Sequence, residues 1–462
     1  MDQRADLGRG NVKKLLFSLS VPTITSQIVN MLYNLVDRVF IGHMQPAETV
    51  GKLALTGVGV CLPIIMVISA FASLMAIGGA PRASIAEGAG ESEKSERIMG
   101  SCLTMLLLTA LVLTVLFEAL AGPLLLLFGA SENTVGYALD YMRIYALGTV
   151  FVQLTLGMNA YITAQGFART SMATVLIGAV LNTVLDPLFI FALGMGVRGA
   201  ALATVLSQAV SALWVMRFLT GKRTRWRLKR ENLRVNARIV LPCIALGLSP
   251  FVMQSTESLI AICFNSSLLR YGGDMAVGTM TVLTSIMQFS HMPLQGLTQG
   301  AQPIVSYNFG ARNAARVKEA YFCLLRACVT YSMTIWLLVE LFPRTFILIF
   351  NSDAALVEYA AWAVRIYMGC SGIFGIQIAC QQTFVALGNA KTSLFLAVWR
   401  KIILLIPLIY ILPHFFADKA FAVFLAEPVA DFGAVAVTSV TFYRQFRRSM
   451  RELEGAEAAK RR

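Results

Sequence analysis

Hydrophobic residues in this chain form long continuous stretches separated by short polar segments. The stretches do not alternate apolar and polar side chains, as a half-buried strand would, and each could cross a bilayer as a helix of ~20 residues. Only helices and closed barrels satisfy every backbone group within lipid, so continuous apolar runs indicate helices. The predicted spans are residues 14–41, 51–80, 95–127, 134–165, 168–193, 197–219, 237–270, 275–307, 315–343, 353–387, 393–412 and 420–443.

A sequence pattern recurs in the two halves of the chain at a fixed offset of 222 residues. Residues 137–171 share Arg-Ile-Tyr and Gly-x-Ala-[Arg/Lys]-Thr-Ser with residues 359–393. At the same offset, the Gly-x-x-Pro-x-x-Ser-x-x-x-Gly-Ala pattern of residues 78–89 returns at 300–311. A repeat with six spans in each half predicts two lobes related by a pseudo-two-fold axis, with a substrate cavity between them near the bilayer midplane.

The composition indicates an all-α integral membrane protein. Hydrophobic residues make up 57% of the chain and charged residues 14%, and the mean hydropathy is +0.68. An average soluble domain has roughly 25% charged residues, so a soluble fold of this length could not bury so much apolar surface. We predict an N-lobe at residues 1–219, a basic linker at 220–236, a C-lobe at 237–446 and a basic tail at 447–462.

Basic residues concentrate on one side of the predicted spans. The linker, both termini and the short loops on the same side carry most of the Lys and Arg residues. The opposite loops hold Lys52, Arg198, Arg270, Arg344 and Lys419. By the positive-inside rule, both termini and the linker face the cytoplasm, which predicts a multi-pass protein of the inner (cytoplasmic) membrane. The net charge of +14 then reflects topology, or contact between the linker and anionic lipid, rather than nucleic acid binding.

Insertion of an ionisable side chain at lipid depth costs roughly 2.5–3.5 kcal/mol, and the first half has two good candidates for a functional acid within its spans. Asp37 lies in the first span, and Asp186 lies in the fifth, one helical turn after Asn182. Such carboxylates could hold a small cation or a proton, and two of them together in a low-dielectric pocket cannot both stay ionised cheaply. Two simpler interpretations remain open. Asp37 could pair with Arg38 or lie at the membrane interface, and Asp186 could mark a helix end before Pro187.

The second half does not repeat these acids, since Leu408 stands 222 residues after Asp186. It offers Glu257 instead, which could attract a cationic substrate, form a second ion site, or be satisfied by neighbouring Ser and Thr hydroxyls. Nearby Met253 and Met287, together with Phe289, suit a promiscuous binding surface because such side chains adapt their packing. The alternative for all three is packing against lipid or other helices.

Four further charged residues lie within the last two spans. Glu427 and Asp431 are one turn apart and either line a cavity or are structural. Arg400 and Lys401 could extend their charged ends toward the cytoplasmic interface or pair with an acid. The sequence leaves these alternatives open.

Several segments spread along nearly the whole chain together resemble the multidrug and toxic compound extrusion (MATE) family. The matching segments are Pro22…Tyr33-x-x-x-Asp37-x-x-x-x-Gly42, Asn182-x-x-x-Asp186-Pro187, Gly199-Ala200-Ala201-x-Ala203-Thr204 and Gln299-Gly300-Ala301-Gln302-Pro303. Each is weak alone, but the combination is specific. The resemblance implies a two-lobed, twelve-helix antiporter that exports amphipathic, often cationic compounds in exchange for H⁺ or Na⁺.

Residue by residue, the resemblance assigns an N-lobe proton or Na⁺ site to Asp37, Asn182, Asp186 and Thr204. It assigns to Pro22 the position where the first helix can bend. Glu257 resembles an acidic position in the seventh helix of one branch, which has a second acid in the tenth helix. In that region this sequence has Gln377, Gln381 and Gln382, so it departs from that branch at a C-lobe Na⁺ site. Gln377 remains a candidate for substrate or ion contact.

The main alternative is a lipid-linked oligosaccharide flippase of the same broad superfamily, but the acids in the spans and the count of twelve argue against it. An enzyme is not expected, because the chain has three histidines and no HExxH, GxSxG or Walker phosphate-loop pattern. The eight cysteines form no CxxC pair. We expect no cofactor beyond the coupling ion, small organic molecules and the bilayer as partners, and a monomer.

Overall fold

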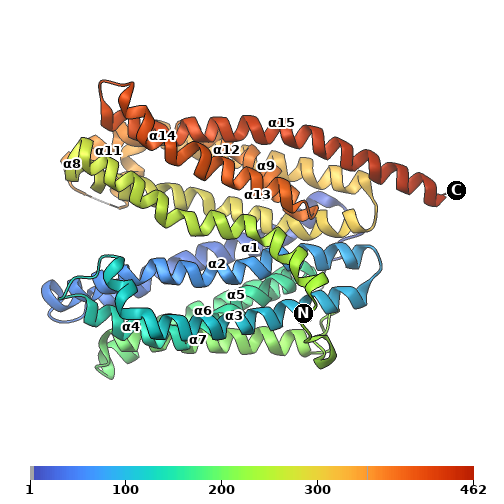
Figure 1. The fold of residues 1–462 in the computed structure, drawn as a ribbon, viewed down its shortest axis with the longest axis horizontal. Coiled ribbons are helices and arrows are strands. Elements are labelled where there is room, and N and C mark those ends of the chain that lie inside the picture. Colours follow the sequence, from blue (N-terminus) through green and yellow to red (C-terminus); the bar gives the residue numbers. More distant parts are fainter. Residues whose placement is uncertain (1–4, 351, 462) are drawn as a thin grey trace. The chain divides into compact units, whose positions relative to one another are not determined.

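The computed structural model describes residues 5–350 and 352–461, and these residues form helices and connecting loops without a β-strand. The elements are α1 (Val12–Gly42), η1 (Ala47–Gly51), α2 (Lys52–Gly88), α3 (Ser92–Leu127), α4 (Val135–Leu147), α5 (Thr149–Ala164), α6 (Ala168–Pro187), η2 (Leu188–Ala192), α7 (Gly196–Thr220), η3 (Arg230–Asn232), α8 (Ala237–Gly310), α9 (Ala314–Leu341), α10 (Pro343–Leu348), α11 (Ala354–Tyr367), α12 (Ser371–Ala386), α13 (Ala390–Val398), η4 (Trp399–Leu405), α14 (Ile406–Ile411), η5 (Leu412–His414) and α15 (Lys419–Arg461) (Figure 1). The predicted cytoplasmic location of the chain ends falls partly on residues 1–4 and 462, which lie outside the described residues.

The helices account for the twelve predicted spans. Within the described part of the chain, nine helices are long and apolar enough to cross a membrane, and the bent pair α11–α12 makes ten. The 74-residue α8 contains two predicted spans, because Gly273 interrupts its helical backbone at φ 65° and ψ −163°. Helices α4 and α5 meet at Gly148 and together cover the fourth predicted span. The prediction of an all-α, twelve-span fold is therefore confirmed.

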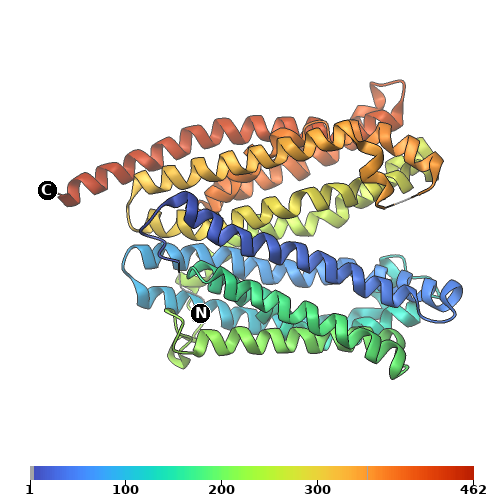
Figure 2. The same cartoon turned by 180° about the vertical axis from the view of Figure 1, so that it is seen from behind.

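The chain forms two compact units. The first comprises the described residues of Met1–Asp6 and Thr25–Gly247, and the second comprises Leu7–Ile24 and Leu248–Arg462. In the first unit, α2, α3, α5 and α7 pack together, and α6 lies along α7 (Figure 2). In the second unit, α12 packs between α9 and α15 (Figure 1). Since the division falls inside α1 and α8, both helices contribute to both units, and the lobe boundaries drawn from the sequence stay a prediction.

The internal repeat appears in the structure as matching helices with matching hydrogen bonds. Both ends of α5 and α12 correspond at the 222-residue offset. The Ser84 hydroxyl donates to the Ala164 carbonyl at 3.1 Å, and the hydroxyl of Ser306 donates to the Ala386 carbonyl at 2.7 Å. In each unit, therefore, an equivalent serine donates a hydrogen bond to the last residue of the equivalent helix, α5 or α12.

The repeated turn after these helices depends on glycine. Gly166 and Gly388 have φ values of 92° and 75°, in the left-handed region that glycine adopts without a steric penalty. The repeated Gly-x-Ala-[Arg/Lys]-Thr-Ser pattern therefore encodes a sharp connection in each unit, as the sequence predicts.

The basic linker is folded against the first unit. Trp226 is buried, and its indole Nε1 donates to Glu87 Oε2 at 3.0 Å. Arg225 Nε pairs with Glu87 Oε1 at 2.5 Å. The Gln165 side-chain oxygen accepts hydrogen bonds from the backbone amides of Arg225 and Trp226 at 2.9 and 3.0 Å. These contacts attach the linker to the ends of α2 and α5 and explain why it belongs to the first unit.

Trp226→Ala is expected to lower the free energy of unfolding by about 3–5 kcal/mol, because it removes a fully buried aromatic side chain and leaves Glu87 without one donor. The thermal unfolding midpoint of the purified protein in detergent measures this effect. Trp214→Ala, at a partly exposed position of α7, should lower the midpoint much less. Equal shifts in the two variants would contradict a folded linker.

Candidate functional site

Three helices of the first unit bring the predicted N-lobe residues together. Asp37 comes from α1, Asn182 and Asp186 from α6, and Thr204 from α7. The Asn182 side-chain amide donates to Asp186 Oδ1 at 3.2 Å and to Thr204 Oγ1 at 3.3 Å. One amide group therefore orients the Asp186 carboxyl and connects α6 with α7.

The carboxyl groups of Asp37 and Asp186 interact directly with each other. Asp186 is fully buried and Asp37 is partly buried. Asp37 Oδ1, Asp186 Oδ2 and Asn182 Oδ1 are buried and accept no hydrogen bond from any described residue. Since an unsatisfied buried acceptor costs about 1–3 kcal/mol, three such oxygens in one cluster favour the uptake of a proton or a small cation.

Two polar residues extend this site beyond what the sequence predicted. The Tyr33 side chain interacts with Asp37 and with Gln208, a residue that we did not predict. Both follow from helical spacing, because Tyr33 is one turn before Asp37 and Gln208 is one turn after Thr204. A search for polar residues one turn from each candidate would have found them. We refer to Asp37, Asn182, Asp186 and Thr204, with Tyr33 and Gln208, as the carboxylate-pair site.

The second unit contains a different arrangement, in which each acid has a basic partner. Arg400 Nη2 lies 2.9 Å from Glu427 Oε1 and 2.7 Å from Asp431 Oδ1. All three side chains are at least nine-tenths buried, and the guanidinium carbon also lies 4.5 Å from the centre of the Phe374 ring. Of the two alternatives that the sequence left open for Arg400, the structure therefore shows pairing with acids.

Lys401 forms a second ion pair, with Glu257. Its ammonium group also donates to the Met253 carbonyl at 3.0 Å. Lys401 and Arg400 both belong to the π-helical turn η4, and both are buried although they are consecutive. The Glu257 side chain is 56% exposed, so it is the one acid of this network that a ligand could reach directly.

The remaining candidates of the second half divide into two groups. Gln377 Nε2 donates to Gln381 Oε1 at 3.4 Å, and Gln381 Nε2 lies 3.3 Å from the sulfur of Met253. These contacts place Met253 and Gln377 beside the Lys401 pair. Met287 instead packs against the hydrophobic core of the second unit, and Phe289 is half-exposed. The structure therefore connects Met253 and Gln377 to the network, but not Met287 or Phe289 among the described contacts.

Pro22 is buried within α1, which continues as one helix across it. Proline lacks the backbone N–H that would bond to the preceding turn, so this point of the helix has one hydrogen bond fewer than its neighbours. The division between the two units falls two residues later, after Ile24. Bending at Pro22 stays a prediction.

Comparison with known proteins gives a consistent result along the chain. The MatE family model matches residues 22–188 and 250–411. Multidrug export protein MepA of Staphylococcus haemolyticus is 23% identical over 429 residues, covering 92% of this chain and 93% of the relative. MepA of Staphylococcus aureus N315 is 22% identical over 428 residues, covering 92% and 93%.

Solved structures show the same fold. A crystal structure of MATE in the bent conformation superposes with a TM-score of 0.89 at 24% identity and covers 98% of both chains. A MOP superfamily transporter from Pyrococcus furiosus gives 0.88 at 24% identity, covering 97% of this chain and 98% of the other. The predicted two-lobed, twelve-helix class is thus the fold of these transporters.

Proposed function

Because this chain belongs to the MatE family of multi-pass membrane transporters, we propose that it is a cation-coupled antiporter that exports small organic molecules. The carboxylate-pair site carries this proposal. Two carboxyl groups in contact, with three buried oxygens lacking a donor, form a site whose stability depends on a bound cation. A bound H⁺ or Na⁺ would compensate one of the two negative charges, and its release would leave two like charges together.

The repulsion between the two charges supplies the driving force for a conformational change. Two unit charges about 4 Å apart repel by about 4 kcal/mol at an effective dielectric constant of 20. A difference of this size shifts a two-state equilibrium by roughly a thousandfold. Asp37 is on α1 and Asp186 on α6, so we infer that α1 moves relative to α6 when the cation leaves. Exchange results if the substrate prefers the cation-free arrangement.

The coupling ion is H⁺ or Na⁺, and both would use the same oxygens. A proton requires only the carboxyl pair. Sodium would be held by Asp37 and Asp186, with the side-chain oxygens of Asn182 and Thr204 completing the ligands, since hard cations take oxygen ligands. We propose no cofactor beyond this ion.

The substrates that we propose are amphipathic organic cations. The relatives from Staphylococcus are named multidrug export proteins. The network of the second unit contains the three acids Glu257, Glu427 and Asp431 but two basic side chains, so acid is in excess and Glu257 is partly exposed. In this proposal, Lys401 acts as a built-in cation that a substrate displaces from Glu257.

Lys401→Met is therefore expected to tighten ethidium binding by about tenfold, because the Glu257 carboxylate no longer has a competing partner. Fluorescence titration of the purified protein measures the affinity. Lys419→Met removes one positive charge at an exposed position at the start of α15, and it should leave the affinity unchanged. Unaltered or weaker binding in Lys401→Met would contradict competition for Glu257.

We further propose that the protein is a monomer of the cell membrane with both termini in the cytoplasm. The one-sided distribution of Lys and Arg supports this orientation.

The test of the proposed function is ethidium transport by proteoliposomes under separately imposed H⁺ and Na⁺ gradients. We expect one gradient to drive ethidium against its concentration gradient, which would also identify the coupling ion. If neither gradient drives ethidium or other organic cations, although the protein is folded, antiport of organic cations would be wrong. The flippase alternative would then be favoured.

A further inference from the structure

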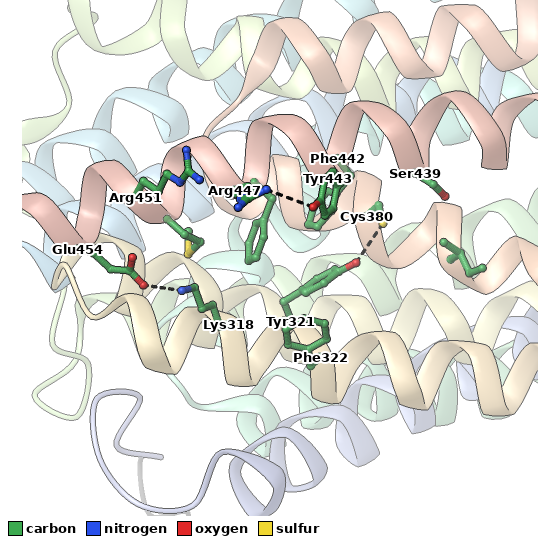
Figure 3. Close-up of a pocket in the computed structure, with 13 residues that line it drawn as sticks. Lys318, Tyr321, Phe322, Cys380, Ser439, Phe442, Tyr443, Arg447, Arg451 and Glu454 are labelled. Atoms are coloured by element: carbon green, nitrogen blue, oxygen red, sulfur yellow. Dashed lines mark hydrogen bonds and ion pairs between the residues drawn. The ribbon is translucent and has the colours of Figure 1, made fainter.

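The second unit contains a cavity of about 560 Å³ bordered by α9, α12 and α15 (Figure 3). It involves neither the carboxylate-pair site nor the Arg400 network. Phe322 and Tyr443, which are 50% and 65% exposed, line it. The cavity is therefore open to the surface of the unit and accessible from the surroundings of these helices.

One wall of the cavity is aromatic and closely packed. The ring of Tyr321 stacks on Phe442 with centroids 4.5 Å apart, and Phe442 stacks on Phe446 at 4.8 Å. The Tyr321 hydroxyl contacts the Cys380 sulfur at 3.4 Å, which fixes the ring against α12 (Figure 3). Aromatic surfaces with few exposed polar atoms favour a hydrocarbon occupant.

The other end of the cavity is basic. Figure 3 shows Arg447, Arg451 and Lys318 gathered toward one end of the cavity, away from Ser439. Lys318 pairs with Glu454 at 2.5 Å, and Glu454 is the one acid that lines the cavity among the described residues. Three basic side chains against one acid leave an excess of positive charge, supplied by the two arginines.

We propose that this cavity binds one anionic phospholipid, with an acyl chain along the aromatic wall and the phosphodiester headgroup between Arg447 and Arg451. The charge of the lining selects this occupant, because an organic cation would be repelled and a zwitterionic headgroup would gain less. Guanidinium groups also bind phosphate oxygens through two parallel hydrogen bonds.

The position of the cavity along α15 agrees with a lipid at the cytoplasmic edge of the bilayer. Ser439 lies within the predicted last span, which ends at residue 443, and Arg447 and Arg451 lie about 6 and 12 Å beyond that end at 1.5 Å per residue. The two arginines are therefore on the headgroup side of the cavity. The basic end of α15 is also the end that the positive-inside rule assigns to the cytoplasm. Anionic lipids are concentrated in that leaflet, where each basic residue contributes about 1 kcal/mol of attraction.

The experiment compares two double variants that remove the same charge from the same helix. Arg447→Gln/Arg451→Gln changes residues that line the cavity. Arg444→Gln/Arg448→Gln changes two exposed arginines that do not line it, one of which pairs with Glu452 at 2.9 Å. Native mass spectrometry of detergent-purified protein, given equimolar phosphatidylglycerol and phosphatidylcholine, counts the lipids retained by each protein. A further arm adds excess glycerol phosphate to wild type.

We expect wild type and Arg444→Gln/Arg448→Gln to retain one phosphatidylglycerol selectively. Arg447→Gln/Arg451→Gln should lose roughly 30-fold in affinity for it, as two contacts of this strength predict. Glycerol phosphate should not displace the lipid, because it lacks the acyl chains. Three outcomes would each overturn the proposal. The two double variants could lose affinity for phosphatidylglycerol equally, or the protein without Arg447 and Arg451 could still select phosphatidylglycerol. Glycerol phosphate could also displace the lipid from wild type. If Arg447→Gln/Arg451→Gln does not fold, Ile376→Trp provides a second test, because it narrows the apolar end of the cavity. Ile376→Trp should reduce lipid retention by a similar factor. Undiminished lipid retention in Ile376→Trp would also overturn the proposal.

Discussion

Asp37→Asn is expected to abolish ion-coupled efflux, lowering the transport rate by at least about 100-fold, while folded protein is recovered in normal amounts. The asparagine keeps the shape and the local contacts of the side chain. It removes the charge whose neutralisation links cation uptake to the position of α1, and coupling free energies between two ligands correspond to factors of about 5–150. Ethidium transport by proteoliposomes under the effective gradient measures the loss.

The thermal stability of this variant distinguishes a functional acid from a structural one. Asp37 lies against Asp186, so neutralising one member relieves repulsion, and we expect the unfolding midpoint of Asp37→Asn to rise or stay unchanged. Asp140→Asn serves as the control, because Asp140 is a 41% exposed acid of the same unit that pairs with Arg198 at 2.9 Å. It should transport normally. Efflux above one-tenth of the wild-type rate in Asp37→Asn, or a lowered midpoint, would contradict the proposed role.

Arg400→Met is expected to destabilise the protein by about 3–5 kcal/mol, because it leaves Glu427 and Asp431 buried together without a counter-ion. Loss of one partner of a buried ion pair costs far more than loss of an exposed one, which is worth about 0–1 kcal/mol. The unfolding midpoint and the yield of monodisperse protein measure the effect. Arg198→Met, which breaks the exposed pair with Asp140, should have little effect on either.

A triple variant separates the electrostatic cause from lost packing. Arg400→Met/Glu427→Gln/Asp431→Asn keeps the volume of the side chains but removes the uncompensated acids, so most of the lost stability should return. If the triple variant is as unstable as Arg400→Met alone, the role of Arg400 lies in packing against Phe374 rather than in neutralising the two acids.

The helical spans and the repeat could be predicted from the sequence because both depend on local patterns. Continuous apolar runs indicate helices whatever their partners, and the 222-residue repeat places the same turn glycine at Gly166 and Gly388. The N-lobe candidates also follow from local spacing, since Asn182 and Asp186 are one turn apart. Their contact with Asp37 could not be derived from spacing, because 149 residues separate Asp37 from Asp186.

The rest of the site depends on contacts between distant segments. Arg400 and Lys401 are neighbours in sequence, yet one pairs with acids of α15 and the other with Glu257 of α8. Both buried residues belong to the π-helical turn η4, and no residue pattern in the sequence predicted this turn. The sequence of the linker likewise predicts a polar, basic loop. The burial of Trp226 depends on its contacts with Glu87 and Gln165, which are distant in the sequence.

Ethidium binding to purified wild type and Asp37→Asn, measured while the H⁺ and Na⁺ concentrations are varied separately, determines whether a cation at the carboxylate pair controls substrate binding. If a cation at the carboxylate pair opposes substrate binding, the wild-type affinity should fall as the coupling ion increases and be insensitive to the other ion. In Asp37→Asn this dependence should disappear. A wild-type affinity that depends on neither ion, or an identical dependence in Asp37→Asn, would contradict coupling through Asp37 and Asp186.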